Sequence, residues 1–227
     1  MRTRSSPPYR SRLRLRRGTP GYRLVEKLNS TVKFILYKLL FPTDMLSDNT
    51  AVVVIDLQRE YFEEDRPWYV PECDRVLENC QRILDAAREA DATVVHARHV
   101  QPTEDSPVFA WGSEYTEIID EIDVRDDEYL VTKTTPSCFQ DTRLEDILVR
   151  NGIENVVSTG LLSAICVDTT ARNADARGYN SYYAKDATSM FPVDGTDPAE
   201  VTEIIATVQD TIFSDVLSTD DVIDELK

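Results

Sequence analysis

The sequence predicts an α/β protein, a three-layer α/β/α sandwich of Rossmann-like type whose mostly parallel sheet has about six strands. Short apolar runs alternate with longer segments in which apolar residues recur at helical spacing. Several runs are continuously apolar, as expected of strands buried on both faces. Strands that alternate with helices form parallel βαβ units, whose right-handed crossovers place helices on both faces of the sheet.

The first half of the chain holds three of the predicted strands. Each is a short apolar run, the helix after the first run has apolar residues near helical spacing, and the long loop is rich in turn-forming and aromatic residues. In order, the predicted elements are a strand at 51–55 that ends at Asp56, a helix at 73–90, a strand at 93–97, a loop at 102–112, a short helix at 115–122, and a strand at 129–132 that ends at Lys133.

The second half repeats the alternation. Asn151 and Gly152 stop one helix and Gly178 closes the next, because both residue types end helices readily. In order, the predicted elements are a helix at 141–150, a strand at 155–159, a helix at 164–177, a strand at 181–184, a helix at 198–210 and a candidate strand at 213–217.

Three reactive side chains follow strands of the predicted sheet. Asp56 follows the first, Lys133 the third, and Cys166 lies just past the fourth, at the start of a helix. Singly, they are consistent with a turn cap, a solvated lysine and a core cysteine. Ligands of open α/β sheets bind beyond the carboxyl ends of the strands, so the convergence of all three indicates an active site.

The chemistry of these three groups is complementary. A thiol becomes a good nucleophile as the thiolate, which a helix N-terminus and a nearby ammonium both favour. A carboxylate beside it can accept the thiol proton and later return it to a leaving nitrogen. Backbone N–H groups of the segment 158–166, which contains Gly160, could hold a developing oxyanion.

The sequence motifs around these residues resemble those of the isochorismatase-like cysteine hydrolases. The matching segments are Val52-Val-Val-Ile-Asp56-Leu-Gln58, Gly112-Ser-Glu114, Lys133-Thr-Thr-Pro-Ser-Cys-Phe139, Thr159-Gly160 through Cys166-Val-Asp-Thr-Thr-Ala-Arg172, Ala176-Arg-Gly-Tyr179 and Lys185-Asp-Ala187. The resemblance covers about residues 50–217. The chain departs from the family pattern at Ser163, where threonine is frequent, and at Cys138, where alanine is usual. We interpret Cys138 as a packing residue.

The resemblance implies a catalytic triad of Asp56, Lys133 and Cys166. It also implies a cis peptide between Leu161 and Leu162, and an oxyanion hole formed by the N–H groups of Leu162 and Cys166. A further set of side chains, from the motifs or from loops after strands, are candidates for binding substrate: Gln58, Phe62, Arg98, His99, Trp111, Phe139 and Ser163.

The same resemblance limits the reaction. Family members that bind a metal carry an Asp-x-His pair, and this chain has only His96 and His99, so we expect no metal and no cofactor. Cys166 favours hydrolysis of an amide, carbamoyl or ureido C–N bond of a small molecule through a thioester. Isochorismatase-type or nicotinamidase activity, and a non-catalytic binding or scaffold role, are the alternatives.

Charge divides the chain at about residue 45. Residues 1–44 hold 11 Lys and Arg and two acids, whereas residues 45–227 carry a formal charge of −25. So acidic a domain repels nucleic acids, and it is typical of proteins that remain soluble in high salt. We therefore predict a halophilic protein; an acidic face on an ordinary protein is the alternative.

Residues 1–44 are interpreted as a disordered or non-native extension that precedes a hydrolase domain at 45–227, with translation starting at Met45. A basic amphipathic membrane-surface segment is the alternative, because the apolar stretch 32–41 is too short to span a bilayer. For 45–227 we expect no membrane partner. Four sparse cysteines suit a reducing cytoplasm, and a homodimer or homotetramer is expected.

Overall fold

A computed structural model describes residue 46 and residues 49–227 of the chain. Six strands form one sheet in the order β3-β2-β1-β4-β5-β6, and every neighbouring pair is parallel. This confirms the predicted α/β fold. The strands are β1 (Thr50–Ile55), β2 (Thr93–His99), β3 (Tyr129–Lys133), β4 (Asn155–Leu161), β5 (Asn180–Ser189) and β6 (Asp215–Leu217).

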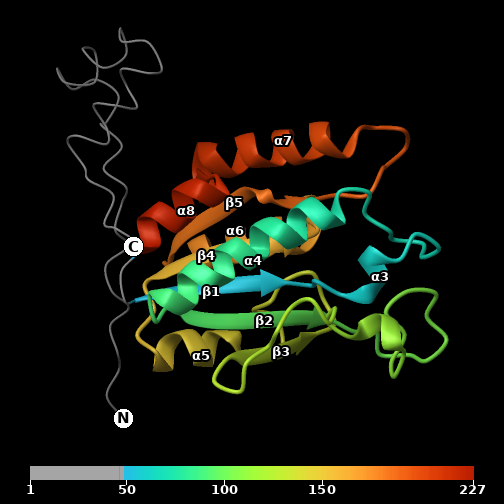
Figure 1. The fold of residues 1–227 in the computed structure, drawn as a ribbon, viewed down its shortest axis with the longest axis horizontal. Helices are drawn as coiled ribbons and strands as arrows, with labels where there is room; N and C mark the ends of the chain where they lie inside the picture. The colour runs from blue at the N-terminus through green and yellow to red at the C-terminus, as the bar shows by residue number, and fades with distance from the viewer. Residues whose placement is uncertain (1–45, 47–48) are drawn as a thin grey trace, which may run out of the picture. The chain divides into compact units, whose positions relative to one another are not determined.

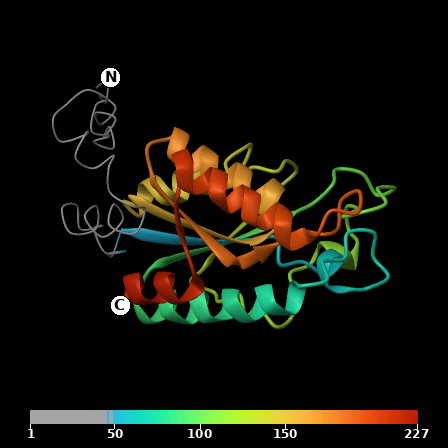
Figure 2. The ribbon, with the colours of Figure 1, turned by 90° about the horizontal axis from the view of Figure 1, so that it is seen from above.

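Helices cover both faces of the sheet (Figures 1 and 2). Figure 2, which views the sheet nearly edge-on, places α4 and α8 on one face and α5, α6 and α7 on the other. The helices are α3 (Arg59–Phe62), α4 (Cys73–Glu89), α5 (Leu144–Arg150), α6 (Asp168–Ala176), α7 (Pro198–Val208) and α8 (Thr219–Leu226). Two π-helical turns, Ser163–Val167 and Gln209–Phe213, precede α6 and follow α7; we call them the first and second π turn.

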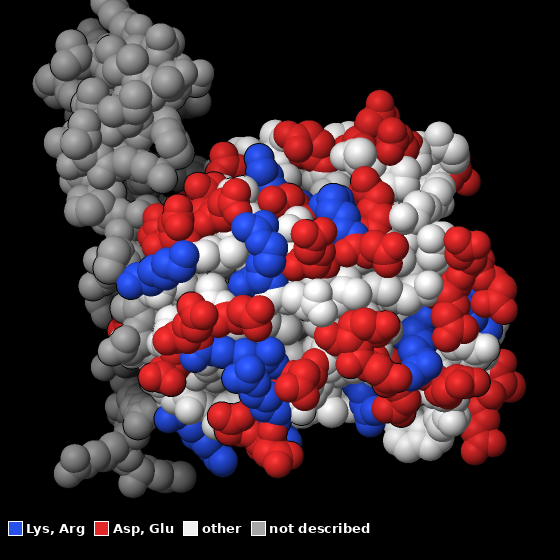
Figure 3. Space-filling view, viewed as in Figure 1, with Lys and Arg blue, Asp and Glu red and all other residues white. Residues whose placement is uncertain are grey.

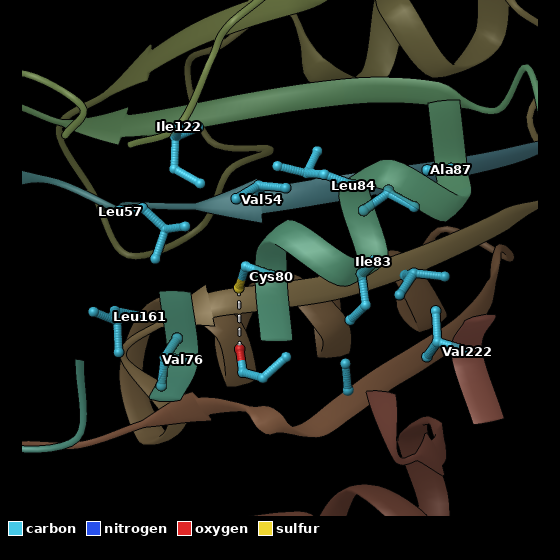
Figure 4. Close-up of a cluster of buried hydrophobic side chains, with 14 of the residues drawn as sticks. Val54, Leu57, Val76, Cys80, Ile83, Leu84, Ala87, Ile122, Leu161 and Val222 are labelled. Carbon is cyan, nitrogen blue, oxygen red and sulfur yellow. Dashed lines mark hydrogen bonds between the residues drawn. The ribbon is translucent and has the colours of Figure 1, made fainter. Parts of the chain in front are cut away.

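The central strands β1 and β4 are buried on both faces, as the unbroken apolar sequence of β1 predicts, whereas the edge strands β3 and β6 are partly exposed. In β1, Val52 and Val54 belong to the core cluster that contains the α4 side chains, whereas Ala51 and Val53 belong to the cluster beneath α5 and α6. Figure 4 shows the α4 side, where Val54 lies near a row of α4 side chains that includes Val76, Cys80, Ile83, Leu84 and Ala87. Apart from the consecutive Ile83 and Leu84, each of these residues lies three or four positions from the next, the spacing that places side chains on one helix face.

Gly160 allows β4 to lie unusually close to β1. It pairs with Ile55 and has a φ of +106°, a conformation that residues with a Cβ rarely adopt. A Cβ at this position would lie 2.1 Å from the carbonyl oxygen of Ile55, far inside contact distance. Only glycine fits here, and the chain immediately afterwards leads into the first π turn.

The structure differs from the predicted elements in a few places. The predicted helix at 115–122 is wrong: only Glu114–Thr116 is helical, as a 3₁₀ turn, and Ile118 forms a bridge with Gln58. The N–H of Ile119 donates to the carbonyl of Leu57, so tertiary pairing overrides the local helical pattern.

Other differences concern the ends of elements and two missed helices, the first of which is the four-residue α3. β5 extends to Ser189, and α5 begins only at Leu144. The sequence analysis also missed α8, although Ser218 and Asp221 form a capping box at its start. The prediction made for residues 1–44 lies outside the described residues.

Candidate active site

The three reactive side chains meet at the carboxyl edge of the sheet, at the ends to which the strand arrows of Figure 1 point. Asp56 directly follows β1, Lys133 is the last residue of β3, and Cys166 lies in the first π turn, after β4. The Lys133 ammonium donates to Asp56 Oδ2 at 2.7 Å, and its Nζ lies 3.3 Å from Cys166 Sγ. The structure therefore brings the three predicted residues into one contact group.

Sheet topology explains this convergence. β1 and β4 are neighbours at the centre of the sheet, and the chain builds outward from β1 to β2 and β3 on one side and from β4 to β5 and β6 on the other. Ligand sites of open α/β sheets lie at such a switch point, where the adjacent strand ends diverge. Lys133 reaches the site from β3, two strands away from β1.

The group is almost completely removed from water. The side chains of Asp56 and Lys133 are both 0% exposed, so their ion pair is fully buried. Burial alone lowers the pKa of Lys133, but the Asp56 carboxylate and the Cys166 sulfur raise it, and the net pKa lies above the ordinary value. Lys133 is therefore a permanent cation between two acidic partners.

The thiol of Cys166 is neutral at rest. Burial raises its pKa well above the ordinary value and Asp56 raises it further, whereas Lys133 lowers it. In the resting site, burial therefore outweighs the ammonium of Lys133 and the helix N-terminus, both of which favour the thiolate. Asp56 Oδ1, also buried, has no hydrogen-bond partner among the side chains and backbone that the structure describes. This oxygen is available to accept a proton.

The backbone before Cys166 has the conformation that the family resemblance implies. The peptide bond between Leu161 and Leu162 is cis. The N–H groups of Ile165 and Val167 both donate to the Leu162 carbonyl, each at 3.1 Å. The buried Ser163 hydroxyl lies 3.0 Å from that of Thr202 on α7, and Tyr183 donates to the Ser163 carbonyl at 3.1 Å. Ser163 thus ties the turn to its neighbours.

An aromatic group adjoins the reactive residues. The ring of His99 lies 5.2 Å from that of Phe109, which lies 5.2 Å from that of Tyr61. Trp68 contacts Tyr61, Phe109 and Phe191, so these rings form a continuous cluster. Burial raises the pKa of Tyr61, and the negative charges of Cys166 and Asp56 raise it further.

Among the candidates for substrate binding, His99 lies on the triad side of the sheet. It pairs with Lys133 in the strand register. Burial is the main cause that lowers the pKa of its imidazole, and the charge of Lys133 lowers this pKa further. The sequence analysis missed Tyr61, although its position five residues after Asp56, in an aromatic segment, was a usable signal.

Arg98 faces away from the triad. Successive side chains of a strand point to opposite faces, and Arg98 donates to Thr132 and Glu117 at 3.1 Å each. It lines a surface hollow with Glu117 and Leu130 on that other face. The structure therefore does not bring the Arg98 guanidinium to the reactive groups.

The side-chain amide of Gln58 forms hydrogen bonds with backbone groups. Its Nε2 donates to the carbonyls of His99 and Thr116 at 2.8 and 2.7 Å, and its Oε1 accepts from the His99 N–H at 2.7 Å. Gln58 therefore joins the segment after β1 to the end of β2 and to the 3₁₀ turn. It positions these loops rather than presenting a free amide.

The remaining aromatic candidates lie outside the contact group. Phe139 stacks with Tyr179 at 6.2 Å beneath the Arg177 guanidinium. Phe62 packs, half-buried, against the core under α4, and Trp111 is 59% exposed in its loop. None of the three has a described contact with Asp56, Lys133 or Cys166.

Cys138 is fully buried within the core cluster that also contains Cys166. Its N–H donates to the Thr170 hydroxyl at 3.1 Å, and burial raises the pKa of its thiol to about 12. These features agree with a packing role. Over the described part of the chain, no cluster of three or more His, Cys, Asp or Glu side chains is arranged to hold a metal ion.

Comparison with known proteins gives one consistent result. Residues 50–221 match the isochorismatase domain family. The chain is 32% identical over 181 residues to the secreted isochorismatase effector Isc1 of Verticillium dahliae, covering 80% of this chain and 94% of that protein. It is 29% identical to the N-carbamoylsarcosine amidase of an Arthrobacter species, covering 78% of this chain and 70% of the amidase.

A solved structure shows the same fold. It is a cysteine hydrolase from Pseudomonas syringae pv. phaseolicola 1448A, with a TM-score of 0.76 at 24% identity, covering 82% of this chain and 95% of that one. The three-layer arrangement around the reactive residues is therefore a known architecture.

Proposed function

This chain belongs to the isochorismatase family, and on that premise we propose that it is a hydrolase that cleaves an amide, carbamoyl or ureido C–N bond of a small molecule through a thioester on Cys166. The observation that carries the proposal is the buried contact of Lys133 Nζ with both Asp56 Oδ2 and Cys166 Sγ. The amidase among its relatives supports the type of bond.

The reaction begins with a neutral thiol, because burial raises the pKa of Cys166. Asp56 accepts the thiol proton as the sulfur attacks the substrate carbonyl, and Lys133 stabilises the negative charges on both partners. The N–H groups of Leu162 and Cys166 hold the oxyanion. Asp56 returns the proton to the leaving nitrogen, which departs as ammonia or an amine and leaves a thioester. Water then attacks the thioester while Asp56 accepts its proton, and the acid product leaves as the Cys166 thiol re-forms.

The test is an ammonia-release screen over small amides, carbamoyl compounds and ureides. A hit should show an acyl adduct on Cys166 by mass spectrometry after rapid acid quench. Nicotinamide and isochorismate belong in the same screen, because turnover of either without an adduct would favour an alternative reaction of the family. Absence of turnover on every compound would favour a binding role.

We place the acyl group of the substrate against the aromatic cluster of Tyr61, Trp68, Phe109 and Phe191. The Lys133 ammonium of the contact group pairs with Asp56 at 2.7 Å, and the Arg66 guanidinium, two residues before Trp68, pairs with Glu60 at 2.8 Å. A substrate carboxylate would therefore meet aromatic rings and pre-paired cations, so the proposed substrates are uncharged in their acyl group.

Matched substrates test this placement. Hexanamide should be hydrolysed with a kcat/KM at least about tenfold higher than that of adipamic acid, which carries a carboxylate at the far end of a similar chain. The physical reason is that burying a carboxylate without a partner is unfavourable. Equal or faster hydrolysis of adipamic acid, measured by ammonia release at neutral pH, would contradict the placement.

We further propose that the hydrolase domain comprises residues 45–227 and acts in the cytoplasm as a homodimer or homotetramer. All four cysteines are unpaired and buried, which suits a reducing compartment. On α7, Ile204 is 61% exposed and Val208 is 37% exposed, which favours association through apolar surface. No helix in the described part of the chain could cross a membrane.

The acidic surface is proposed to be an adaptation to salt. Figure 3 shows one face, on which Asp and Glu side chains spread across the surface and outnumber Lys and Arg. The Debye length falls from about 30 Å at 0.01 M salt to about 3 Å at 1 M, so repulsion across the domain is removed only in high salt.

Stability should therefore increase with salt. The melting temperature is expected to rise by at least about 5 °C between 0.01 and 1 M KCl and more slowly beyond, because screening is then nearly complete. Calorimetry measures the melting temperature, and urea denaturation measures the free energy of unfolding. Guanidinium is unsuitable because it is itself a salt. A flat or falling melting temperature would remove the argument for halophily.

A further inference from the structure

Gln209 connects the second π turn to the segment that carries Cys166. It is the first residue of that turn and is fully buried. Its Nε2 donates to Asp168 Oδ1 at 2.8 Å and to the Asp168 carbonyl at 3.2 Å. Asp168 is the first residue of α6 and follows Cys166 by only two positions. A buried side chain thus joins the second π turn to the residue that directly follows the first.

Neighbouring groups fix the orientation of the Gln209 amide. Ser214 donates to Gln209 Oε1 at 2.8 Å, so the oxygen faces Ser214 and the NH₂ group faces Asp168. The hydroxyl of Ser214 lies 2.8 Å from that of Ser181 on β5, and Ser181 donates to the Ala171 carbonyl on α6 at 3.0 Å. This buried chain leaves the amide little freedom to rotate.

Asp168 is held from its other side as well. Arg172 donates to Asp168 Oδ2 at 2.8 Å, and its guanidinium lies over the Phe213 ring at 4.2 Å. Each carboxylate oxygen therefore has its own donor, one from α6 and one from the second π turn. The start of α6 is anchored in both directions.

Such anchoring matters because Cys166 lies in a π turn. The Val167 N–H donates to the carbonyl five residues earlier, so this turn contains one residue more than an α-helical turn. Relaxation to α geometry would rotate the side chains by about 100° per residue displaced, which would carry the thiol away from Lys133. A fixed first residue of α6 opposes that relaxation.

We propose that Gln209 is a positioning residue that, through Asp168, holds the first π turn in the register that keeps the Cys166 thiol against Lys133. This inference rests on the proposed role of Cys166 as the nucleophile. Gln209 has no described contact with the triad, so its effect on the reaction is transmitted through the backbone between Cys166 and Asp168.

Iodoacetamide is a suitable probe, because it alkylates Cys166 directly and needs no physiological substrate. The full-length protein is compared with Gln209→Met, which removes both donors, and with Gln209→Glu, which keeps the shape and the acceptor facing Ser214. Gln81→Met is the matched control, since the Gln81 amide donates to the Glu121 carbonyl at 2.9 Å, remote from α6. Peptide mass spectrometry follows each cysteine separately.

Both Gln209 variants should lower the maximal rate of Cys166 alkylation by about tenfold or more, because misplacement of a reacting atom mainly affects the rate. The iodoacetamide concentration that gives half of the maximal rate should change little. The pH of half-maximal alkylation should rise, since loss of the Lys133 contact leaves burial, Asp56 and Cys138 to raise the pKa of Cys166. The Gln81 variant should match the wild type.

Labelling of Cys80, which is fully buried, reports general loosening in the same sample. Cys166 rates within twofold of wild type in both Gln209 variants would overturn the inference, as would a loss of rate that only parallels increased Cys80 labelling. If one of the two Gln209 variants does not fold, the Cys166 alkylation rate of the other variant tests the inference. Failure of the ammonia-release screen would refute the proposed hydrolysis but leave these alkylation rates unaffected, so the two failures are distinguishable.

Discussion

Replacing Cys166 by alanine is expected to reduce hydrolysis by at least about 10⁴-fold, because the covalent route is lost and only binding and the oxyanion hole remain. Among the described thiols, only that of Cys166 lies within hydrogen-bond distance of the Lys133 ammonium, at 3.3 Å, so no other described thiol is placed to substitute for it. The measurement is kcat on the best compound from the amide screen, with the melting temperature recorded alongside.

Two companion variants make the result specific. Cys138→Ala should retain activity, since it removes a thiol from the same core cluster without touching the reactive group. Asp56→Asn should lose turnover nearly as completely as Cys166→Ala, because an amide cannot accept the thiol proton. Full activity of Cys166→Ala on the physiological substrate would exclude the thioester mechanism.

The largest effect on stability is expected from Gly160→Ala. The added Cβ would lie 2.1 Å from the Ile55 carbonyl oxygen, a backbone atom that cannot move aside without separating β1 from β4. Together with the strain of φ +106°, the free energy of unfolding should fall by about 3 kcal/mol or more. Urea denaturation measures the loss, and activity should disappear with it.

Gly178→Ala is the control for backbone conformation alone. Gly178 has a φ of +91°, but a Cβ there would meet nothing within 4 Å. Its substitution should therefore cost only the conformational strain, about 1 kcal/mol or slightly more. Equal losses of unfolding free energy in the two variants would show that the close approach of β4 to β1 adds nothing to the effect of Gly160→Ala.

The sequence predicted the sheet and the triad for the same reason. Apolar runs identify strands, and Asp56 and Lys133 lie at the ends of two such runs, whereas Cys166 lies a few residues after a third. Parallel strands end at one edge, so local patterns were enough to place three distant residues together.

Contacts that depend on a partner distant in the sequence could not be predicted from local patterns. Arg98 and His99 are consecutive, and the alternation of a strand says that they face opposite sides but not which side holds Lys133. The helix predicted at 115–122 failed because Ile119 pairs with Leu57, more than 60 residues earlier. The bond of Gln209 to Asp168 likewise leaves no trace in local spacing.

The complete burial of the Asp56–Lys133 pair separates its electrostatics from those of the rest of the molecule. Mobile ions cannot enter the space between these two side chains, so added salt, which screens the acidic exterior, leaves their attraction nearly unchanged. The proposed chemical step is therefore insulated from the salt that we propose stabilises the fold. With such a site we expect the intrinsic rate per folded molecule to be nearly the same in dilute buffer and in concentrated salt.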